Sequence, residues 1–443
     1  MTRRDALRLG AVGVVAGCSD KGALNDTGFS EEPAPEPWEP EGPVDDTAFP
    51  LGVQLGDPRS DSANCWTRYE GDGDVTLVVA QWDGLDWVEW SRTVWTPAGG
   101  GYIHVVVEGL SGGAWYAFFF ESAAGGRSIA GRWRSPDPSG LRTLVFGGAS
   151  CTWNGHAPFP VLSQAAQADL DFFLLAGDQV YADNSQSVSD YRAHWAANLG
   201  TAGYRDLLAS TAAIATWDDH EVRNEWGTDP VSADQEAFGK QAFFENTACT
   251  PRLGDPLWRS LRFGDALELY VLDCRSERDP SAAQYISEEQ LEWLVESMRS
   301  SNAVFQCILN SVPVADLQDL VGDVKVEDRW QGFPEQRARL IEAIGGVENI
   351  YFLTGDFHTG LVARVDAEGP GQGMFDVLMG AAGNNMNPMG GLLVPTDQFL
   401  TGVSERNYAR FTADSATEKM VVEYVGEDGG VMDAISLPDG EKV

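Results

Sequence analysis

Apolar and polar positions follow two different rhythms along this chain of 443 residues. From Phe49 to Ser135, seven short apolar runs follow one another at spacings of about 10 to 12 residues, separated by Gly, Asp and Pro and without a helical period. The clearest runs lie at 64–69, 75–79, 102–107 and 115–120. This pattern is typical of an immunoglobulin- or fibronectin-like β-sandwich, which we predict for residues 48–136.

Beyond Pro136 the apolar runs alternate with helical stretches. Strands are predicted at 143–146, 172–175, 304–308 and 350–353, and a hairpin at 261–272. The clearest helix is predicted after residue 287. Ser287 and Gln290 form a capping box, and an apolar face at helical spacing follows it. Alternating strands and helices predict a layered α/β domain over residues 141–443. In such sheets, functional side chains collect just beyond the carboxyl ends of the strands.

Residues 1–18 have the features of an export signal. Arg3 and Arg4 precede a short apolar run, and this arrangement resembles the twin-arginine (Tat) signal of proteins that are exported in the folded state. The sequence Val-Ala-Gly-Cys that ends at Cys18 resembles a lipobox, in which Cys18 would be lipidated. An ordinary basic signal with an incidental cysteine is the alternative. We favour the lipoprotein, because small residues precede Cys18 and a long linker follows it.

Residues 19–47 are acidic and rich in proline, and we predict an extended linker there. No later stretch approaches the roughly 18 consecutive apolar residues that a membrane span needs. The protein is therefore expected in the cell envelope, either periplasmic or at the cell surface, with the lipid anchor as its contact with the membrane. The six cysteines form no CxxC pair, so disulfides are not expected to organise the fold.

The charge balance limits the partners of the protein. The chain has 30 basic and 67 acidic residues and a formal net charge of −37. Such a charge repels nucleic acid and anionic lipid, so a nucleic-acid-binding surface is not expected. It also repels phosphate esters, which local cations such as bound metal ions would have to hold.

Four apolar runs end in residue types that bind metal ions. The runs are 146–151, 174–181, 215–221 and 352–358. Taken singly, a Gly-Asp pair after a strand is explained equally well by a turn or a helix cap. Taken together at the strand ends of one domain, clustered carboxylates would repel one another by about 4 kcal/mol per pair near a surface, so they predict a compensating multivalent cation.

The motifs in these segments resemble those of the PhoD-type alkaline phosphatases and phosphodiesterases, a branch of the calcineurin-like metallophosphatase superfamily. They are Ser-Cys at 150–151, Gly-Asp-x-x-Tyr at 177–181, Trp-Asp-Asp-His-Glu at 217–221 and Gly-Asp-x-His at 355–358. Supporting stretches at 49–58, 272–278 and 330–334 extend the resemblance, in order, over roughly residues 48–365. The resemblance implies an N-terminal β-sandwich followed by a four-layer α/β metallophosphatase domain.

By this resemblance, Cys151, Asp178 and Tyr181 bind a ferric ion, Fe3+. The chemistry is consistent, since a hard trivalent ion favours phenolate and carboxylate and a thiolate adds donor strength. Asp356 and His358 are implied to belong to a second cluster that holds divalent ions, commonly Ca2+. Asp178 is the natural bridge between the ions.

The resemblance also implies the catalytic residues. Asp219 occupies the place of a metal-binding Asn in the wider superfamily, and His220 would protonate the leaving oxygen or stabilise the charged transition state. The implied activity is the hydrolysis of phosphomonoesters or phosphodiesters, small or polymeric, by a metal-bound hydroxide that attacks phosphorus in line. Arg275 could contact the phosphate, and a structural salt bridge below the site explains it equally well.

Three departures from the family pattern affect these expectations. Asn224, an expected metal ligand, is followed by Glu225 where the family often has a second Asn. Cys274 stands where Thr is usual, and residues 380–387 differ from the usual Ser/Thr-rich run, so the substrate could differ. A second hypothesis is a surface-anchored binding protein whose metal cluster is structural or degenerate. The intact set of ligands argues against it.

Overall fold

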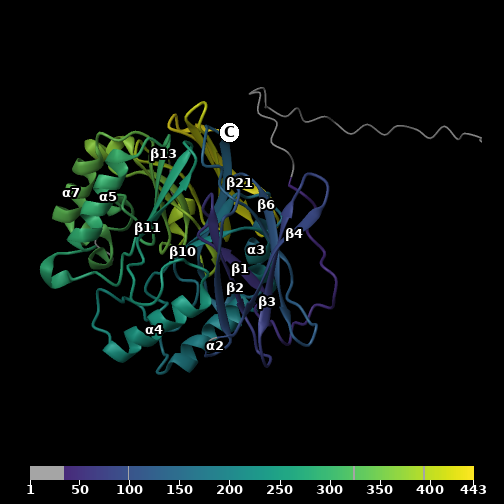
Figure 1. Cartoon of the computed structure of the whole chain (residues 1–443). Helices are drawn as coiled ribbons and strands as arrows, with labels where there is room; N and C mark the ends of the chain where they lie inside the picture. Colours follow the sequence, from purple (N-terminus) through teal and green to yellow (C-terminus); the bar gives the residue numbers. More distant parts are fainter. Residues whose placement is uncertain (1–33, 98, 323–324, 393–394) are drawn as a thin grey trace, which may run out of the picture. The chain divides into compact units, whose positions relative to one another are not determined.

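The structure, a computed structural model, describes residues 34–97, 99–322, 325–392 and 395–443 (Figure 1). The predicted export signal at 1–18, with Cys18, lies outside the described residues. None of the described helices is both long and apolar enough to span a membrane.

The region predicted as a sandwich folds into seven strands. They are β1 (Val53–Gly56), β2 (Ser62–Arg68), β3 (Val75–Trp82), β4 (Trp87–Trp95), β5 (Tyr102–Glu108), β6 (Trp115–Ser122) and β7 (Gly131–Arg134). One sheet has the order β4-β3-β6-β7, and β1, β2 and β5 are antiparallel neighbours in another. Alternate residues of both sheets, such as Val79, Val105 and Phe118, meet in a shared core. The predicted sandwich is therefore confirmed.

The sandwich and the α/β domain share a sheet. β1 pairs in parallel with a strand of the α/β domain, β10 (Ala213–Thr216), so that β1, β2 and β5 extend that domain's large sheet. Directly after β1, the buried Asp57 accepts two hydrogen bonds from Arg259, at 2.7 and 2.8 Å. A buried carboxylate needs such a partner, because its desolvation would otherwise be costly. This ion pair links residues that lie far apart in the sequence.

Residues 34–47, which fall within the predicted linker, lie against the four-stranded sheet. The rings of Trp38 and Phe119 are 5.2 Å apart, centroid to centroid. Arg132 donates to the carbonyl of Pro35 at 2.7 Å, and the indole of Trp87 donates to the carbonyl of Glu36 at 2.9 Å. The described part of the linker is therefore docked on the sandwich.

The α/β domain contains two sheets. Its strands in the eleven-stranded sheet are β8 (Thr143–Thr152), β9 (Phe172–Ala176), β10, β17 (Ala381–Gly383), β19 (Asn407–Asp414), β20 (Lys419–Gly426), β21 (Val431–Leu437) and β22 (Glu441–Lys442). The seven-stranded sheet contains β11 (Arg259–Phe263), β12 (Leu267–Val271), β13 (Phe305–Asn310), β14 (Ile350–Thr354), β16 (Phe375–Leu378), β15 (Gly360–Arg364) and β18 (Phe399–Val403), in that order.

Helices cover the outer faces of the two sheets. The helices packed on the eleven-stranded sheet are α1 (Pro160–Ala165), α2 (Val188–Leu199), α3 (Ala202–Ser210) and α4 (Ala233–Asn246). The longer helices packed on the seven-stranded sheet are α5 (Glu288–Ser300) and α7 (Pro334–Ile344). Two short helices, α6 (Gln318–Val321) and α8 (Met389–Leu392), lie in connections.

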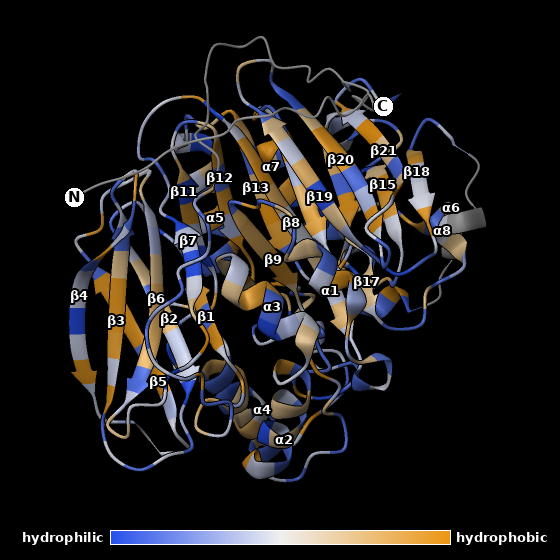
Figure 2. Ribbon diagram, turned by 90° about the vertical axis from the view of Figure 1, so that its right-hand side faces the viewer, coloured by the Kyte–Doolittle hydropathy of each residue, from blue (hydrophilic) through white to orange (hydrophobic). Residues whose placement is uncertain are grey.

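The two sheets pack face to face on aromatic and aliphatic side chains. Strands of both sheets, such as β9, β12 and β13, are largely coloured as hydrophobic in Figure 2. Phe172 stacks between Phe146 of the same sheet, at 4.6 Å, and Phe263 of the other sheet, at 4.3 Å. Each sheet is thus buried on both faces, which explains the continuous apolar runs that mark its strands in the sequence. The order helix, sheet, sheet, helix confirms the predicted four-layer domain.

Two local predictions in this domain can be compared with the structure, and of the predicted capping box only the Ser287 half forms, because the Gln290 side chain accepts the backbone N–H of Asp273 instead. The side chain of Ser287 caps α5 by accepting the backbone N–H of Gln290 at 3.1 Å. β11 and β12 form the predicted antiparallel hairpin, and Gly264 in its turn has a φ of 58°. Both features depend on neighbours in the sequence, and this is why the pattern was sufficient to predict them.

Candidate metal centre

The predicted ligand residues lie where the carboxyl ends of the two sheets meet. β8, β9 and β10 are parallel neighbours, so Cys151, Asp178 and Asp219 emerge at the same edge. Asp356 follows β14 of the other sheet. The sheets approach closely at Gly355, where a Cβ atom would lie 2.5 Å from the carbonyl oxygen of Ala176. A side chain at this position would force the two sheet edges apart.

Four of the predicted ligands have an unusual backbone conformation. Cys151, Asp178, Asp356 and His358 have φ values of 58°, 56°, 58° and 52°. Residues other than glycine rarely adopt this left-handed region, and they do so at a cost that the surrounding structure must offset. The conformation bends the backbone sharply at the strand ends and brings side chains from different strands to the same edge of the sheets.

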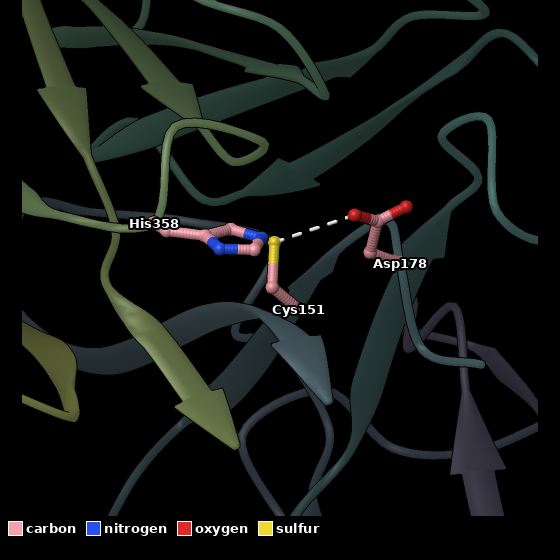
Figure 3. Close-up of side chains that lie close together, drawn as sticks. All are labelled: Cys151, Asp178 and His358. Carbon is pink, nitrogen blue, oxygen red and sulfur yellow. Dashed lines mark hydrogen bonds between the residues drawn. The ribbon is translucent and has the colours of Figure 1, made fainter. Parts of the chain in front are cut away.

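A first group of close ligand atoms comprises Cys151, Asp178 and His358, whose ligand atoms all lie within 4.8 Å of one another (Figure 3). The thiol of Cys151 lies 3.5 Å from Oδ2 of Asp178. The hydroxyl of Tyr181 donates to the same Oδ2 at 2.9 Å and lies 3.2 Å from Nε2 of His358. The residues predicted to bind the ferric ion are therefore together, and His358, which we had grouped with Asp356, lies beside them.

The orientation of the His358 ring suits a metal ligand. Its Nδ1 lies 2.9 Å from the backbone carbonyl of Asn385, so Nδ1 carries the proton in the neutral ring. Nε2 then has a free lone pair directed toward Tyr181 and the first group. Fixing one ring nitrogen by a carbonyl is the usual arrangement of histidines that bind metal ions.

A second group comprises Asp178, Asp219 and His220, again with ligand atoms within 4.8 Å. Asp178 belongs to both groups of described residues, which is the bridging position expected of it. Nδ1 of His220 lies 2.7 Å from Oδ1 of Asp183. Sequence reasoning missed Asp183: it follows Tyr181 by two residues, and nothing in the local pattern distinguishes it from the other acidic residues.

A cavity of about 380 Å³ opens beside the second group. Its wall contains Asp219, His220, Asn224, Glu225, Lys325, Asp328, Arg329, Asp356, Phe357, His358, Asn385, Met386 and Asn387. The predicted ligands Asn224 and Asp356 are thus at the cavity, although Asp356 is in neither group of close ligand atoms among the described residues. Three residues of the divergent segment 380–387 also line it. This arrangement places that segment where it can contact a substrate.

Glu221, the last residue of the Trp-Asp-Asp-His-Glu motif, links the turn that follows β9 to the turn that follows β10. Its fully buried carboxylate accepts the backbone N–H groups of Gln179 at 2.6 Å, Asp178 at 3.1 Å and Asp218 at 2.9 Å. Burial, followed by the charge of Asp178, raises the pKa of Glu221 to about 8. Glu221 therefore fixes the main chain at the site rather than contacting a ligand in the cavity.

Arg275 has a structural position, which corrects its assignment as a catalytic residue. Its side chain is fully buried and does not line the cavity. Nε donates to Asp218 at 2.6 Å, and Nη2 donates to Asp328 at 3.1 Å. A guanidinium whose donors are directed at two buried carboxylates is not available to a substrate phosphate. The sequence analysis gave a structural salt bridge and a contact with the phosphate equal weight, and the structure has the salt bridge.

The electrostatics of the two groups follow from the burial of several acidic groups together. Burial raises the pKa of Asp178 to about 7, an effect that His220 opposes and Asp219 reinforces. Burial also raises the pKa values of Asp356 and of the Cys151 thiol well above their ordinary range. Burial lowers the pKa of His220, but Asp178 and Asp183 outweigh it, and the pKa is raised to about 10.

These residues fit metal ions. Thiol, phenol, carboxylate and imidazole groups converge within ligand distance of one another, and their anionic forms are unfavourable without added positive charge. A bound cation would reverse these shifts, because it stabilises thiolate, phenolate and carboxylate. The first group offers sulfur, oxygen and nitrogen donors, whereas the cavity side offers mostly oxygen donors.

Comparisons with known proteins identify the family of this chain. A family model described as PhoD-like phosphatase matches residues 144–384, more than half of the chain, and one described as PhoD-like phosphatase, N-terminal domain, matches residues 35–137. Alkaline phosphatase D of Bacillus subtilis (strain 168) is 25% identical over 384 residues, which cover 72% of this chain and 66% of that protein, just under two thirds of its length.

A solved structure described as the structure of PhoD has the same fold. Its TM-score is 0.77, with 22% sequence identity, and the match covers 88% of this chain and 90% of that one. At this identity the likeness shows the fold alone. The family models, by contrast, match both regions of the chain in order and include the segments that carry the candidate metal ligands. The chain belongs to the PhoD-like phosphatase family.

Proposed function

We propose that this protein hydrolyses phosphomonoesters, phosphodiesters or both in a metal-dependent reaction outside the cytoplasm. The observation that carries the proposal is the position of Asp178, which is shared by two groups of potential metal ligands next to a cavity. Adjacent metal sites that share a carboxylate suit the displacement of an ester oxygen at phosphorus, since both the attacking and the leaving oxygen then have a cation nearby. Membership of the PhoD-like phosphatase family supports the same reaction.

The residues divide naturally between two kinds of metal ion. Cys151, Asp178 and Tyr181, with His358 beside them, would hold Fe3+. Asp178, Asp219 and the cavity residues Asn224 and Asp356 would hold divalent ions, for which Ca2+ is our candidate because the donors are mostly oxygen. When bound, the ions would neutralise the phosphate and lower the pKa of a coordinated water.

His220 is the residue proposed to act on the leaving group. Asp183 holds Nδ1, so Nε2 is the ring nitrogen left for the substrate. Because Asp183 bonds Nδ1 and favours the charged ring, His220 can donate a proton from Nε2 to the leaving oxygen or stabilise its negative charge.

We also propose that the protein is exported by the twin-arginine route and anchored in the cell envelope through a lipid on Cys18. The support is the sequence Val-Ala-Gly-Cys after paired arginines. A Cys18→Ser protein should leave the membrane fraction and become soluble in the envelope or the medium. If this variant stays with the membrane as the wild type does, the anchor is ruled out.

The reaction itself can be tested on the exported protein as isolated. Metal analysis should find iron together with a divalent ion, and the protein should hydrolyse para-nitrophenyl phosphate, its bis-ester, or both. Removing the metal ions with a chelator should abolish turnover, and returning them should restore it. As a matched pair, Asp178→Asn should lose metal and turnover, whereas Asp234→Asn, at an exposed position in the first turn of α4, should change neither. A protein that contains its metal ions and turns over neither ester would contradict the proposal and favour a binding protein.

A further inference from the structure

The turn between β3 and β4 carries several exposed apolar side chains. Leu85 in this turn is 82% exposed, more than any other large apolar side chain among the described residues. Val88 and Trp90, in the first half of β4, are 50% and 37% exposed. β4 is the edge strand of the four-stranded sheet and lies at the rim of the molecule in Figure 2. Single exposed apolar side chains are common on protein surfaces, but several within six residues indicate a contact surface.

Hydrogen bonds within the turn hold its backbone in one conformation. One carboxylate oxygen of Asp83 accepts the backbone N–H groups of Leu85 and Asp86, both at 2.9 Å, and the N–H of Asp83 donates to the carbonyl of Asp86 at 3.1 Å. The rings of Trp82 and Trp87, which are partners across the two strands, lie 5.5 Å apart in an edge-to-face arrangement. The turn is therefore ordered before it meets a partner, so binding does not incur the entropic cost of ordering a loop.

The N-terminal segment meets the sandwich beside this turn. The indole N–H of Trp87, the first residue of β4, donates to the carbonyl of Glu36 at 2.9 Å. Further along the segment, the ring of Trp38 lies against that of Phe119. Cys18, the proposed site of the lipid anchor, precedes Glu36 by 18 residues. An extended chain of this length spans at most about 65 Å. The exposed apolar side chains therefore lie at the end of the sheet from which the chain leads back to Cys18.

We propose that the hairpin tip, residues 82–90, contacts the surface of the membrane in which the lipid on Cys18 is anchored. The inference rests on the proposed lipid anchor. Tryptophan side chains favour the boundary between water and the acyl chains, because the ring is largely apolar and its N–H is polar. Leu85 and Val88 would bury apolar area among the headgroups. An edge strand has unpaired backbone N–H and C=O groups, which cannot enter the hydrocarbon core, so the tip stays at the depth of the headgroups.

The charge of the hairpin tip determines which lipids it favours. Asp83, Asp86 and Glu89 are exposed, and Arg92, further along β4, is paired with Glu89 at 3.1 Å. The whole chain has a net charge of −37. The tip therefore favours zwitterionic headgroups over anionic ones, which would repel it. A few apolar side chains bind a bilayer weakly. The contact thus orients the anchored protein, and the Cys18→Ser protein still leaves the membrane fraction.

The test uses the full chain with Cys18→Ser, which removes the lipid, and vesicles of phosphatidylcholine. In this parent protein, Leu85→Ser with Val88→Thr is compared with Leu253→Ser with Val431→Thr, a matched control at side chains that are 56% and 47% exposed elsewhere. Sedimentation with increasing amounts of vesicles gives the partition coefficient. The tip variant should bind about tenfold more weakly than the parent, and the control should bind as the parent does. Phosphatidylglycerol in the vesicles should weaken binding of the parent.

Thermal midpoint and turnover of para-nitrophenyl phosphate should be unchanged in both variants, because the substitutions lie at exposed positions outside the cavity. A parent that binds phosphatidylcholine vesicles no better than the tip variant would overturn the inference. So would a tip variant that binds vesicles as the parent does but has lost self-association in sedimentation velocity, since the tip would then join two copies of the chain. If the Cys18→Ser protein stays with the cell membrane, the proposed anchor fails separately, and vesicle binding of the purified proteins still decides the role of the tip.

Discussion

Oδ1 of Asp183 lies 2.7 Å from Nδ1 of His220 and also accepts the backbone N–H of Asn224 at 2.6 Å. One carboxylate thus orients the proposed proton donor and the chain segment that carries a proposed metal ligand. Burial raises the pKa of Asp183, but the hydrogen bond and charge of His220 and the backbone N–H of Asn224 together outweigh it, and the net shift is downward. Asp183 is therefore ionised at neutral pH and holds the His220 ring in one orientation.

Asp183→Asn should lower kcat by about 10- to 100-fold, because the ring loses its charged partner but keeps its place. His220→Ala should lower kcat further, by about 10²- to 10⁴-fold. Both effects should be larger with an alkyl phosphate than with para-nitrophenyl phosphate, because a poor leaving group depends more on proton donation. Rates with the two substrates and metal content are the measurements.

Two results would change the role of His220. Full activity of His220→Ala on the alkyl ester would exclude it as the proton donor. Loss of metal from His220→Ala, with metal retained in Asp183→Asn, would make His220 a ligand of the second group instead.

Arg275→Met should destabilise the protein by about 3 to 5 kcal/mol, because it leaves the fully buried carboxylate of Asp218 without its partner. Urea unfolding of the wild type and the variant measures this difference. Arg339→Met, at an exposed ion pair, is the matched control and should change the free energy of unfolding by less than about 1 kcal/mol. An Arg275→Met protein as stable as this control, with weakened phosphate binding, would restore the catalytic assignment of Arg275.

The sequence was sufficient for features that depend on neighbouring residues. Short apolar runs at regular spacing predicted the strands of the sandwich, and apolar runs followed by Cys151, Asp178 and Asp356 predicted strand ends at a candidate metal site. Parallel strands place their carboxyl ends at one edge, so this inference needed no knowledge of the distances.

Features that depend on packing between distant segments could not be predicted in the same way. His358 joins Cys151 because the ends of β14 and β8 approach at Gly355, and no pattern within either segment encodes this contact. Arg275 lies in a stretch that supports the family resemblance, but the carboxylates that bury its guanidinium, Asp218 and Asp328, come from elsewhere in the chain. The pairing of β1 with β10 is another such contact.

His104 gives a prediction for the pH dependence of stability. Burial beside Trp66, on the face of β5 opposite the sandwich core, lowers its pKa from 6.5 to about 4, with a smaller effect in the same direction from Arg252. As the pH falls, the unfolded chain therefore takes up this proton before the folded one does. The contribution of His104 to stability is fully present above pH 6.5 and is lost progressively toward pH 4, by up to about 3 kcal/mol.

His104→Phe keeps a ring against Trp66 and removes the titration. Between pH 7 and acid pH, the free energy of unfolding should therefore fall less in this variant than in the wild type. His194→Phe, on the exposed face of α2, is the matched control and should follow the wild type. Parallel losses in the wild type and His104→Phe would show that His104 does not carry this dependence.

Tyr181 and Cys151 test the identity of the metal in the first group. If both bind Fe3+ as anions, charge transfer from phenolate and thiolate to iron should colour the purified protein in the visible range. Tyr181→Phe keeps the ring and removes the hydroxyl that lies 2.9 Å from Asp178, so the band should shift or fade while the packing survives. Cys151→Ser should remove the thiolate part of the band.

Both changes should depress activity far more than stability, since Asp178, Asp219 and Asp356 remain to hold divalent ions at the cavity. Thermal midpoints, metal content and rates on the two para-nitrophenyl esters separate the effects. As a control, Tyr191→Phe removes a buried hydroxyl that donates to a backbone carbonyl at 2.6 Å outside both groups, and it should leave the colour unchanged. A colourless wild type that is fully active and contains no iron would overturn the ferric assignment, because neither Tyr181 nor Cys151 could then be bound as a ligand to Fe3+. A hydrolase that uses only divalent ions would still be consistent with such a result, since Asp178 and the oxygen donors of the cavity do not depend on the iron.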